Sequence, residues 1–414
     1  MTNASSSPAI DPTRLWASLT EISRFGATVR GGLDRLALGD HDRAARDYLV
    51  AQARHHGYDV IVDALGNIFI TRAGARPDLT PVLLGSHLDS QPSGGRFDGT
   101  YGVIAGLEVL RALDDADVTT LRPVVLANWT NEEGARFSPS MLGSAVYAGR
   151  HDAGAALARS DADGATIGAE LARIGYAGTG AGPARVHRSL ELHIEQGPVL
   201  EDRGLDIGVV TGVYGIHWLD VVVRGRSGHA GTTPAGSRQD ALVAASRIVL
   251  AVDELTAAEP ELRATTGEVR VWPNSRNAIP GEVRLALDLR HPAEETLARV
   301  ERALSEQVAE IAARSGVTAT VTPVLSQPPT QFDGGTVALV REVAAERGYS
   351  ATDLVSGAGH DSVHLAHVTR AGMIFIPCVG GVSHREDEDI RPEWALTGAD
   401  VLLHATVRAA AEES

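Results

Sequence analysis

The residues best suited to chemistry lie in the stretch 85–99, which reads GSHLDSQPSGGRFDG. It offers one imidazole, His87, and two carboxylates, Asp89 and Asp98, on a backbone loosened by glycines. It follows an apolar run and precedes a helical pattern, which is typical of a loop between a buried strand and a helix. Imidazole and carboxylate groups are common metal ligands, so this stretch is a candidate part of a metal site.

Similar groups follow other expected strands. They are Glu132 and Glu133 after residues 122–128, His193 within 188–194, and His384 after the strand at 373–379. Each of them alone is explained equally well as a solvated acidic turn or a structural histidine. Strand ends of one parallel sheet meet at the same edge, however, and four of them carrying such groups favour a metal site.

Two adjacent glutamates on an extended segment point to different sides, so one can bind a cation while its neighbour accepts a proton. Together with three histidines and Asp98, one such glutamate makes five ligands, too many for a single catalytic tetrahedral ion. Five ligands suit two divalent ions about 3.5–4 Å apart that share Asp98 as a bridge. We expect the Asp89 carboxylate to fix the tautomer of His87; the alternative is a loop cap.

The elements that must position these groups indicate two domains. A helical pattern over 11–57 is followed by strands and helices that alternate, which predicts an α/β domain with a largely parallel sheet. Residues 212–327 instead predict four strands and two helices in a compact α+β arrangement of the split-βαβ kind. We therefore expect a discontinuous catalytic domain, 1–211 and 328–414, that carries an inserted domain, 212–327.

Composition narrows the class of protein. The chain has 37 basic and 53 acidic residues, a formal charge of −16, which argues against nucleic acid or an anionic membrane as partner. All basic residues are arginine, which excludes a Schiff-base lysine. The single cysteine, Cys378, excludes an internal disulfide. With no signal-peptide pattern and no membrane-spanning apolar run, we expect a soluble cytoplasmic protein.

Several motifs occur in the order found in one known family. They are GSHLDSQPSGGRFDG, NEEGARF, ELHIEQGPVLE, GHAGTTP, SRNAIPG, SGAGHD and GGVSH, and they span residues from about 10 to about 410. The chain thereby resembles the hydantoinase/carbamoylase family of dinuclear metal amidohydrolases, relatives of zinc peptidases. The resemblance implies a zinc-peptidase-like catalytic domain with a mostly parallel central sheet and an inserted ferredoxin-like lid or dimerisation domain.

The same resemblance implies a ligand set that spacing alone leaves open. It implies two divalent ions per subunit, with zinc expected first and manganese, cobalt or nickel also suitable. One ion takes His87, Asp98 and His193, and the other takes Asp98, Glu133 and His384. Glu132 is then the general base that takes a proton from the bridging water and hands it to the leaving nitrogen.

The resemblance also implies residues for the substrate. His229 would stabilise the oxyanion in the active site of a partner subunit, which implies a homodimer. Asn277 and Arg290 would bind the substrate carboxylate, for which a planar guanidinium is well suited. Weaker candidates are Gln196 and His217, for the ureido group and the lid, and Gly359, in a loop near the site.

The loop before Asp98, residues 91–98, is similar to that of N-carbamoyl-L-amino-acid hydrolases. We therefore expect a metal-bridged hydroxide to cleave the carbamoyl C–N bond of an N-carbamoyl-L-amino acid, giving the amino acid, carbon dioxide and ammonia. The alternatives are allantoate hydrolysis, amide hydrolysis on another N-acyl or β-ureido acid, and a catalytically silent metal-stabilised dimer. The charged turn 385–389 either alters access to the metals or is simply solvated.

Overall fold

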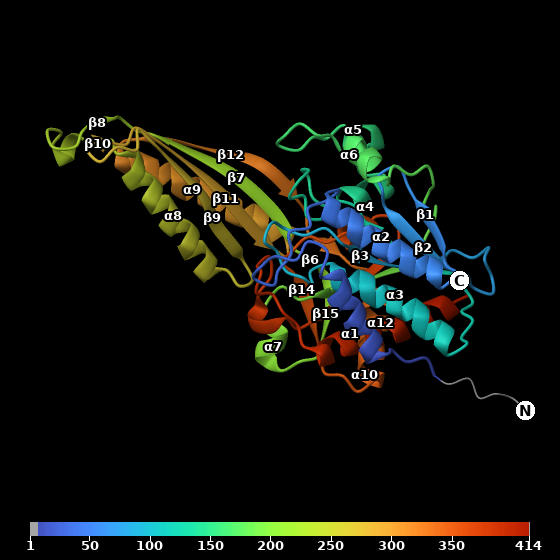
Figure 1. Ribbon diagram of the computed structural model, residues 1–414. Helices are drawn as coiled ribbons and strands as arrows, with labels where there is room; N and C mark the ends of the chain where they lie inside the picture. The colour runs from blue at the N-terminus through green and yellow to red at the C-terminus, as the bar shows by residue number, and fades with distance from the viewer. Residues whose placement is uncertain (1–6, 414) are drawn as a thin grey trace, which may run out of the picture. The chain divides into compact units, whose positions relative to one another are not determined.

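The computed structural model describes residues 7–413, and these divide into two compact units (Figure 1). The larger unit contains the described residues up to Thr211 and from Gln331 onward, and the smaller unit is Gly212–Thr330. No helix among the described residues is long and apolar enough to cross a membrane.

The larger unit is built on a nine-stranded sheet. Its strands are β1 (Asp59–Val62), β2 (Ile68–Arg72), β3 (Val82–His87), β4 (Val124–Trp129), β5 (Arg188–Ile194), β6 (Ile207–Val213), β13 (Thr330–Gln331), β14 (Ala351–Ser356) and β15 (Arg370–Ile376). They follow the order β1-β2-β4-β3-β5-β15-β6-β13, with β14 paired to β6. This is the α/β architecture expected from the alternation of strands and helices.

The middle of this sheet is parallel and its flanks are not. Strands β4, β3, β5 and β15 run parallel to one another, whereas β1–β2, β2–β4 and β15–β6 are antiparallel pairs. The short connection between β1 and β2 allows only a hairpin, which explains the antiparallel flank. The central strands are buried along almost their whole length, as parallel strands covered on both faces must be.

Helices cover the sheet. They are α1 (Pro12–Ile22), α2 (Asp40–His55), α3 (Thr100–Asp115), α4 (Leu142–Tyr147), α5 (Ala153–Leu157), α6 (Ile167–Ile174), α7 (Val199–Arg203), α10 (Gly334–Glu346), α11 (Ser362–Leu365) and α12 (Pro392–Ala411). Figure 1 shows α1, α3 and α12 gathered along one side of the sheet. Apolar side chains of α3 are buried on all of its sides, because it lies between the sheet and these neighbours.

The helical pattern predicted over 11–57 is wrong between α1 and α2. Residues 23–39 form turns and isolated bridges, and Gly26 and Gly31 adopt positive φ angles. Arg35 explains this departure, since its buried guanidinium donates to the carbonyl oxygens of Leu88, Ile22 and Phe25. These tertiary hydrogen bonds replace the helical ones.

The smaller unit is an antiparallel sheet with two helices on one face. Its elements are β7 (Gly215–Arg224), β8 (Gly228–His229), α8 (Ala241–Ala258), β9 (Arg263–Trp272), β10 (Ala278–Ile279), β11 (Glu282–His291), α9 (Glu294–Ser315) and β12 (Thr318–Gln327). The main sheet has the order β12-β7-β11-β9, and α8 and α9 pack side by side on it (Figure 1). Alternate residues of β7 and β11 point into this core, which gives the split-βαβ topology expected from the sequence.

Candidate metal centre and substrate residues

The four parallel strands of the larger unit bring five candidate ligands to one edge of the sheet. His87 is the last residue of β3, His193 lies at the end of β5, and Glu133 follows β4. Asp98 ends the loop between β3 and α3, and His384 lies in the loop after β15. The parallel register therefore places side chains from distant parts of the sequence together, as the strand-end pattern predicts.

The first cluster consists of His87, Asp98 and His193, all of them buried. The Nε2 atom of His193 lies 3.0 Å from Asp98 Oδ1, and the Nε2 atom of His87 lies 3.7 Å from the same oxygen. Gly99 makes this approach possible, since a Cβ atom there would lie 2.3 Å from His87 Nε2. Its φ of 61° also belongs to the left-handed region that glycine tolerates.

The second cluster consists of Asp98, Glu133 and His384. The Nε2 atom of His384 lies 3.1 Å from Asp98 Oδ2 and 3.4 Å from Glu133 Oε2. The backbone and side-chain amides of Gln91 donate to the two oxygens of Glu133 and fix its carboxylate. The two oxygens of Asp98 thus face different histidines, which is the arrangement of a bridging carboxylate.

The donor set fits divalent metal ions. In each cluster the three candidate ligand atoms lie within 4.8 Å of one another. Imidazole nitrogen and carboxylate oxygen are the ligands that Zn²⁺ and related transition ions take in proteins. Carboxylates that are buried close together lose their hydration and repel one another, which costs free energy. A bound cation offsets this cost.

The electrostatics show how strongly these groups interact. Burial opposes the charged form of His193, yet its hydrogen bond to Asp98 raises its pKa to about 9. The hydrogen bond to Asp98 likewise raises the pKa of His384 to about 9. Burial lowers the pKa of His87 to about 4. Asp98 therefore interacts strongly with one imidazole of each cluster, His193 and His384.

Glu132 lies beside the first cluster and outside the second. Its Oε2 atom is 3.5 Å from His87 Nε2. Burial, reinforced by the nearby Asp361 carboxylate, raises the pKa of Glu132 well above its ordinary value. A buried carboxyl with a raised pKa is a group that can exchange a proton near neutral pH.

The role expected of the Asp89 side chain is wrong. His87 Nδ1 lies 2.9 Å from the backbone carbonyl oxygen of Asp89, whereas the Asp89 carboxylate is 3.9 Å from that nitrogen. The carboxylate instead accepts the backbone N–H groups of Glu132 and Glu133. The carbonyl therefore orients the imidazole, and the side chain caps the loop that carries both glutamates, which was the alternative interpretation.

Left-handed backbone marks the same edge of the sheet. Asn131, Gln196 and His384 have φ angles of 58°, 57° and 56°, and each follows one of the central strands. Non-glycine residues adopt this conformation only when their surroundings hold them there, and such positions cluster at functional sites.

Gln196 and Gly359 lie near the clusters. Gln196 Nε2 donates to Asp98 Oδ2 and to Ser383 Oγ, both at 3.0 Å. Its Oε1 atom is buried without a hydrogen-bond partner among the described residues. A Cβ atom on Gly359 would lie 3.1 Å from the Cε atom of Met141, whose backbone N–H donates to the Glu132 carbonyl.

His229 and Asn277 lie together in the smaller unit: His229 ends β8, and Asn277 directly precedes β10, which pairs with β8. The carbonyl of Asn277 accepts the backbone N–H of Ala230, next to His229. His229 Nδ1 accepts the backbone N–H groups of Gly231 and Thr232. A neutral His229 therefore carries its proton on Nε2, where it is able to donate to another group.

His217 and Arg290 are engaged within the smaller unit. His217 is buried against α9, with Nδ1 2.7 Å from Glu301 Oε2 and Nε2 3.0 Å from Ser326 Oγ. Both ring nitrogens are engaged within the unit, and the side chain points to the helix-covered face of the sheet. Arg290 forms a two-point contact with Asp288 and is partly exposed.

The contacts of Glu388 and Ser383 with the candidate ligands were not predicted from the sequence. Glu388 accepts the backbone N–H of Asp98, and Ser383 contacts both Glu388 and Asp98. The available signal was the position of a glutamate four residues after His384, but a turn with five charged residues looks solvated.

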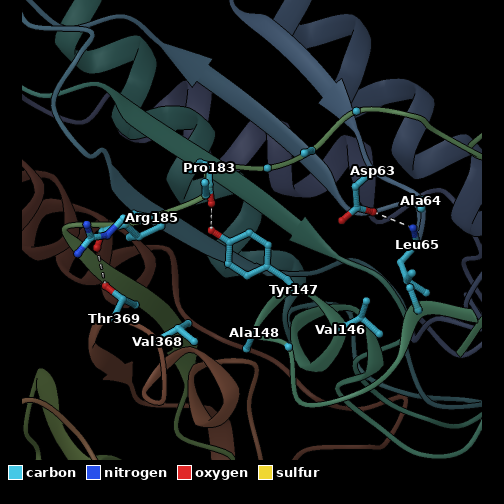
Figure 2. A pocket seen from close by; sticks show the side chains of 17 residues that line it. Asp63, Ala64, Leu65, Val146, Tyr147, Ala148, Pro183, Arg185, Val368 and Thr369 are labelled. Carbon is cyan, nitrogen blue, oxygen red and sulfur yellow. Dashed lines mark hydrogen bonds between the residues drawn. The ribbon is translucent and has the colours of Figure 1, made fainter. Parts of the chain in front are cut away.

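A separate pocket of about 510 Å³ lies elsewhere in the larger unit (Figure 2). Asp63, Tyr147, Arg185, Val368 and Thr369 are among its lining residues. Tyr147 donates to the carbonyl of Pro183 at its wall. None of the candidate ligands lines this pocket.

Comparison of the sequence with known proteins identifies related enzymes. Residues 83–408 match the model of Peptidase family M20/M25/M40. The chain is 43% identical to an N-carbamoyl-L-amino-acid amidohydrolase of Rhizobium meliloti over 97% of each chain. It is 34% identical to a ureidoglycolate hydrolase of Arabidopsis thaliana, covering 97% of this chain and 87% of that protein.

A solved structure is closer still. The hydantoinase/carbamoylase family amidase from Burkholderia multivorans is 48% identical, with a TM-score of 0.94 over 98% of this chain and all of that one. The chain belongs to the hydantoinase/carbamoylase family of amidases, with an M20-peptidase-like fold. The family implies divalent metal ions, and the two clusters are able to bind them.

Proposed function

We propose that the protein hydrolyses N-carbamoyl-L-amino acids to the free amino acid, carbon dioxide and ammonia. The observation that carries the proposal is that Asp98 belongs to both clusters of candidate ligands, with Glu132 beside the first of them. The substrate class is supported by relatives named for this reaction, of which the Rhizobium meliloti protein matches over nearly the whole chain.

Two divalent ions would be held by His87, Asp98 and His193, and by Asp98, Glu133 and His384. When bound, such ions polarise a carbonyl group and lower the pKa of water. We expect zinc first, with manganese, cobalt or nickel as alternatives, because the donor set suits each of them.

The remaining residues of the chain supply binding and proton transfer. Glu132 accepts the proton of the attacking water at a carboxylate oxygen and passes it to the leaving nitrogen. The unpartnered Oε1 atom of Gln196 accepts a ureido N–H of the substrate. His229 donates from Nε2 to the developing oxyanion, which its tautomer permits. Asn277 and Arg290 bind the substrate carboxylate, and the Gly359 loop contributes to the substrate site.

We further propose that the protein acts as a homodimer through the inserted domain, 212–327. Six of the ten exposed large hydrophobic side chains in the described part of the chain lie in the smaller unit: Trp218, Val243, Leu250, Val269, Trp272 and Val324. An interface formed by this unit would cover such side chains. Light scattering during size-exclusion chromatography should give twice the mass of one chain.

A substrate panel tests the reaction. Ammonia release is measured with N-carbamoyl-L-methionine, N-carbamoyl-β-alanine, allantoate and ureidoglycolate, and release of the free amino acid is measured with N-acetyl-L-methionine, each with the D form where one exists. We expect the highest kcat/KM for the N-carbamoyl-L-amino acid. Ureidoglycolate is the main competitor, because a relative 34% identical is named for it. A preference for allantoate or ureidoglycolate would replace our substrate but keep the reaction type.

A further inference from the structure

One carboxylate in the charged turn 385–389 differs from its neighbours. Glu386, Asp387 and Asp389 form surface ion pairs with Arg30, Arg385 and Arg96, respectively. Among the described residues, no arginine pairs with Glu388, which is only 2% exposed. The turn is therefore not wholly solvated. The burial of Glu388 needs an explanation other than a surface ion pair.

The hydrogen bonds of Glu388 lead to the metal centre. Its Oε1 atom accepts the backbone N–H groups of Phe97 and Asp98, both at 3.0 Å. Its Oε2 atom accepts the hydroxyl of Ser383 at 2.9 Å. Two of the three donors thus belong to the loop of the bridging Asp98, and the third belongs to the residue before His384.

Gly95 provides the space for this carboxylate. A Cβ atom at Gly95 would lie 1.9 Å from Glu388 Cδ and 2.1 Å from either of its oxygens. Alanine at this position would have to displace the carboxylate. Because the carboxylate is the far end of a flexible side chain, the displacement is possible without rebuilding the backbone.

We propose that Glu388 is a positioning residue, which holds the backbone of Asp98 and the loop of His384 together so that both bind the same metal ion. The proposal rests on the metal site described under the proposed function. A buried carboxylate is costly unless donors satisfy it. Here the donors are the main chain of one ligand, Asp98, and the hydroxyl of Ser383 beside another, which lie 285 residues apart in the sequence. Such outer contacts of metal ligands affect metal affinity by about 10- to 100-fold.

Four variants of the full-length protein test this role. Glu388→Leu removes the acceptor, and Gly95→Ala displaces it from the other side. Glu388→Gln keeps an oxygen for the two backbone N–H groups, and its amide is able to donate to Ser383 Oγ. Asp387→Asn is the matched control, since Asp387 is exposed in the same turn. Cobalt(II) binding to the metal-free proteins is followed by visible absorption, and urea unfolding is measured without metal.

We expect Glu388→Leu and Gly95→Ala to weaken the binding of one of the two cobalt ions by about 10- to 100-fold. Glu388→Gln and Asp387→Asn should bind both ions within about threefold of the wild type. Unfolding of metal-free Gly95→Ala should remain cooperative, which would show that this variant folds.

Wild-type cobalt affinity in Glu388→Leu, or reduced stability with unchanged affinity, would overturn the proposal. If Glu388→Leu does not fold, wild-type affinity in Gly95→Ala would overturn it equally. A wild-type protein that binds no cobalt would instead remove the proposed function, and this inference with it.

Discussion

At the scale of single residues, adjacent side chains of the same type have different surroundings. Glu133 receives two N–H groups from Gln91 and lies 3.4 Å from His384. Glu132 faces His87 instead and is not part of the second cluster. The alternation of side chains after β4 therefore separates a candidate ligand from a candidate base.

This difference predicts that matched substitutions of the two glutamates affect different properties, turnover in one case and metal content in the other. Glu132→Gln should lower kcat by about 100-fold or more, because proton transfer is lost while the metal ligands remain. Glu133→Gln should lower the metal content, because one ligand loses its charge. Turnover and metal per chain are measured for both variants. Full turnover by Glu132→Gln would show that Glu132 is not the base.

Two histidines of the smaller unit provide a second contrast. His229→Ala should lower kcat by about 100-fold with little change in stability, since its Nε2 is the proposed oxyanion donor. His217→Ala should lower the thermal unfolding temperature and leave kcat nearly unchanged, because His217 contacts Glu301 and Ser326 inside the unit. Kinetics and calorimetry of both variants check this, and the reverse pattern would exchange the two roles.

At the scale of elements, the strands supply the ligands but the loops between strands and helices are held by their own contacts. The loop after β4 is linked to α6, because Arg136 donates to Glu170. Glu170 also pairs with Arg173 in the last turn of the same helix. This pairing anchors the loop that carries Glu132 and Glu133.

The α6 anchor predicts a pH-dependent contribution to stability. Hydrogen bonds from Arg173 and Arg136 lower the pKa of Glu170 to about 2, although its burial acts in the opposite direction. Its contribution is therefore complete above pH 4.5, the ordinary pKa, and is lost as the pH falls toward 2. Glu170→Gln should lower the free energy of unfolding by about 1 kcal/mol at pH 7, and by less at pH 3.

Urea unfolding at several pH values measures this difference. Glu310→Gln, which changes an exposed glutamate on α9, serves as the control and should have no effect at any pH. A Glu170→Gln deficit that stays constant from pH 7 to pH 3 would contradict the assignment.

Many of the helices and strands were predictable from the sequence. The strand predicted at 188–194 is β5, because apolar residues at 190, 192 and 194 alternate with polar ones, which is typical of a strand. The first of the two helices predicted within 212–327 begins at Ala241, where the Asp240 side chain caps the backbone N–H groups of Leu242 and Val243. Strand β14 was not predicted, since its residues are half exposed and lack a strong hydrophobic pattern.

At the site, the candidate ligand side chains were predictable, but the contacts that hold them were not. Ligand types and strand ends sufficed to bring together His87, Asp98, His193 and His384, because parallel strands fix where their ends meet. Contacts made by main-chain atoms leave no trace in side-chain patterns. The orienting carbonyl of Asp89 and the buried position of Glu388 therefore required coordinates.

At the scale of the whole molecule, the metal ligands and the substrate residues are divided between two units. The five candidate ligands, Glu132, Gln196 and Gly359 belong to the larger unit. His229, Asn277 and Arg290 belong to the smaller one. We expect metal binding to be a property of the larger unit, and the substrate residues of the inserted one to affect turnover without changing metal affinity.

Removal of the metals tests this division. Dialysis against a chelator should abolish hydrolysis and lower the unfolding temperature, because bound ions stabilise only the folded chain, by about 2.7 kcal/mol at a free concentration 100 times Kd. Adding zinc, manganese or cobalt should restore both properties. His229→Ala should show the same metal-dependent rise in unfolding temperature as the wild type. Hydrolysis that continues in metal-free protein would exclude metal dependence.

The position of β15 in the sheet has a consequence for folding during translation. In the finished sheet, β15 lies between β5 and β6, yet it is translated only after both of them and after the whole smaller unit. At common rates of synthesis the interval from residue 188 to residue 370 lasts about 10 to 40 s. During that time the nascent β5 exposes an open hydrogen-bonding edge, which is where unwanted pairing with other chains begins.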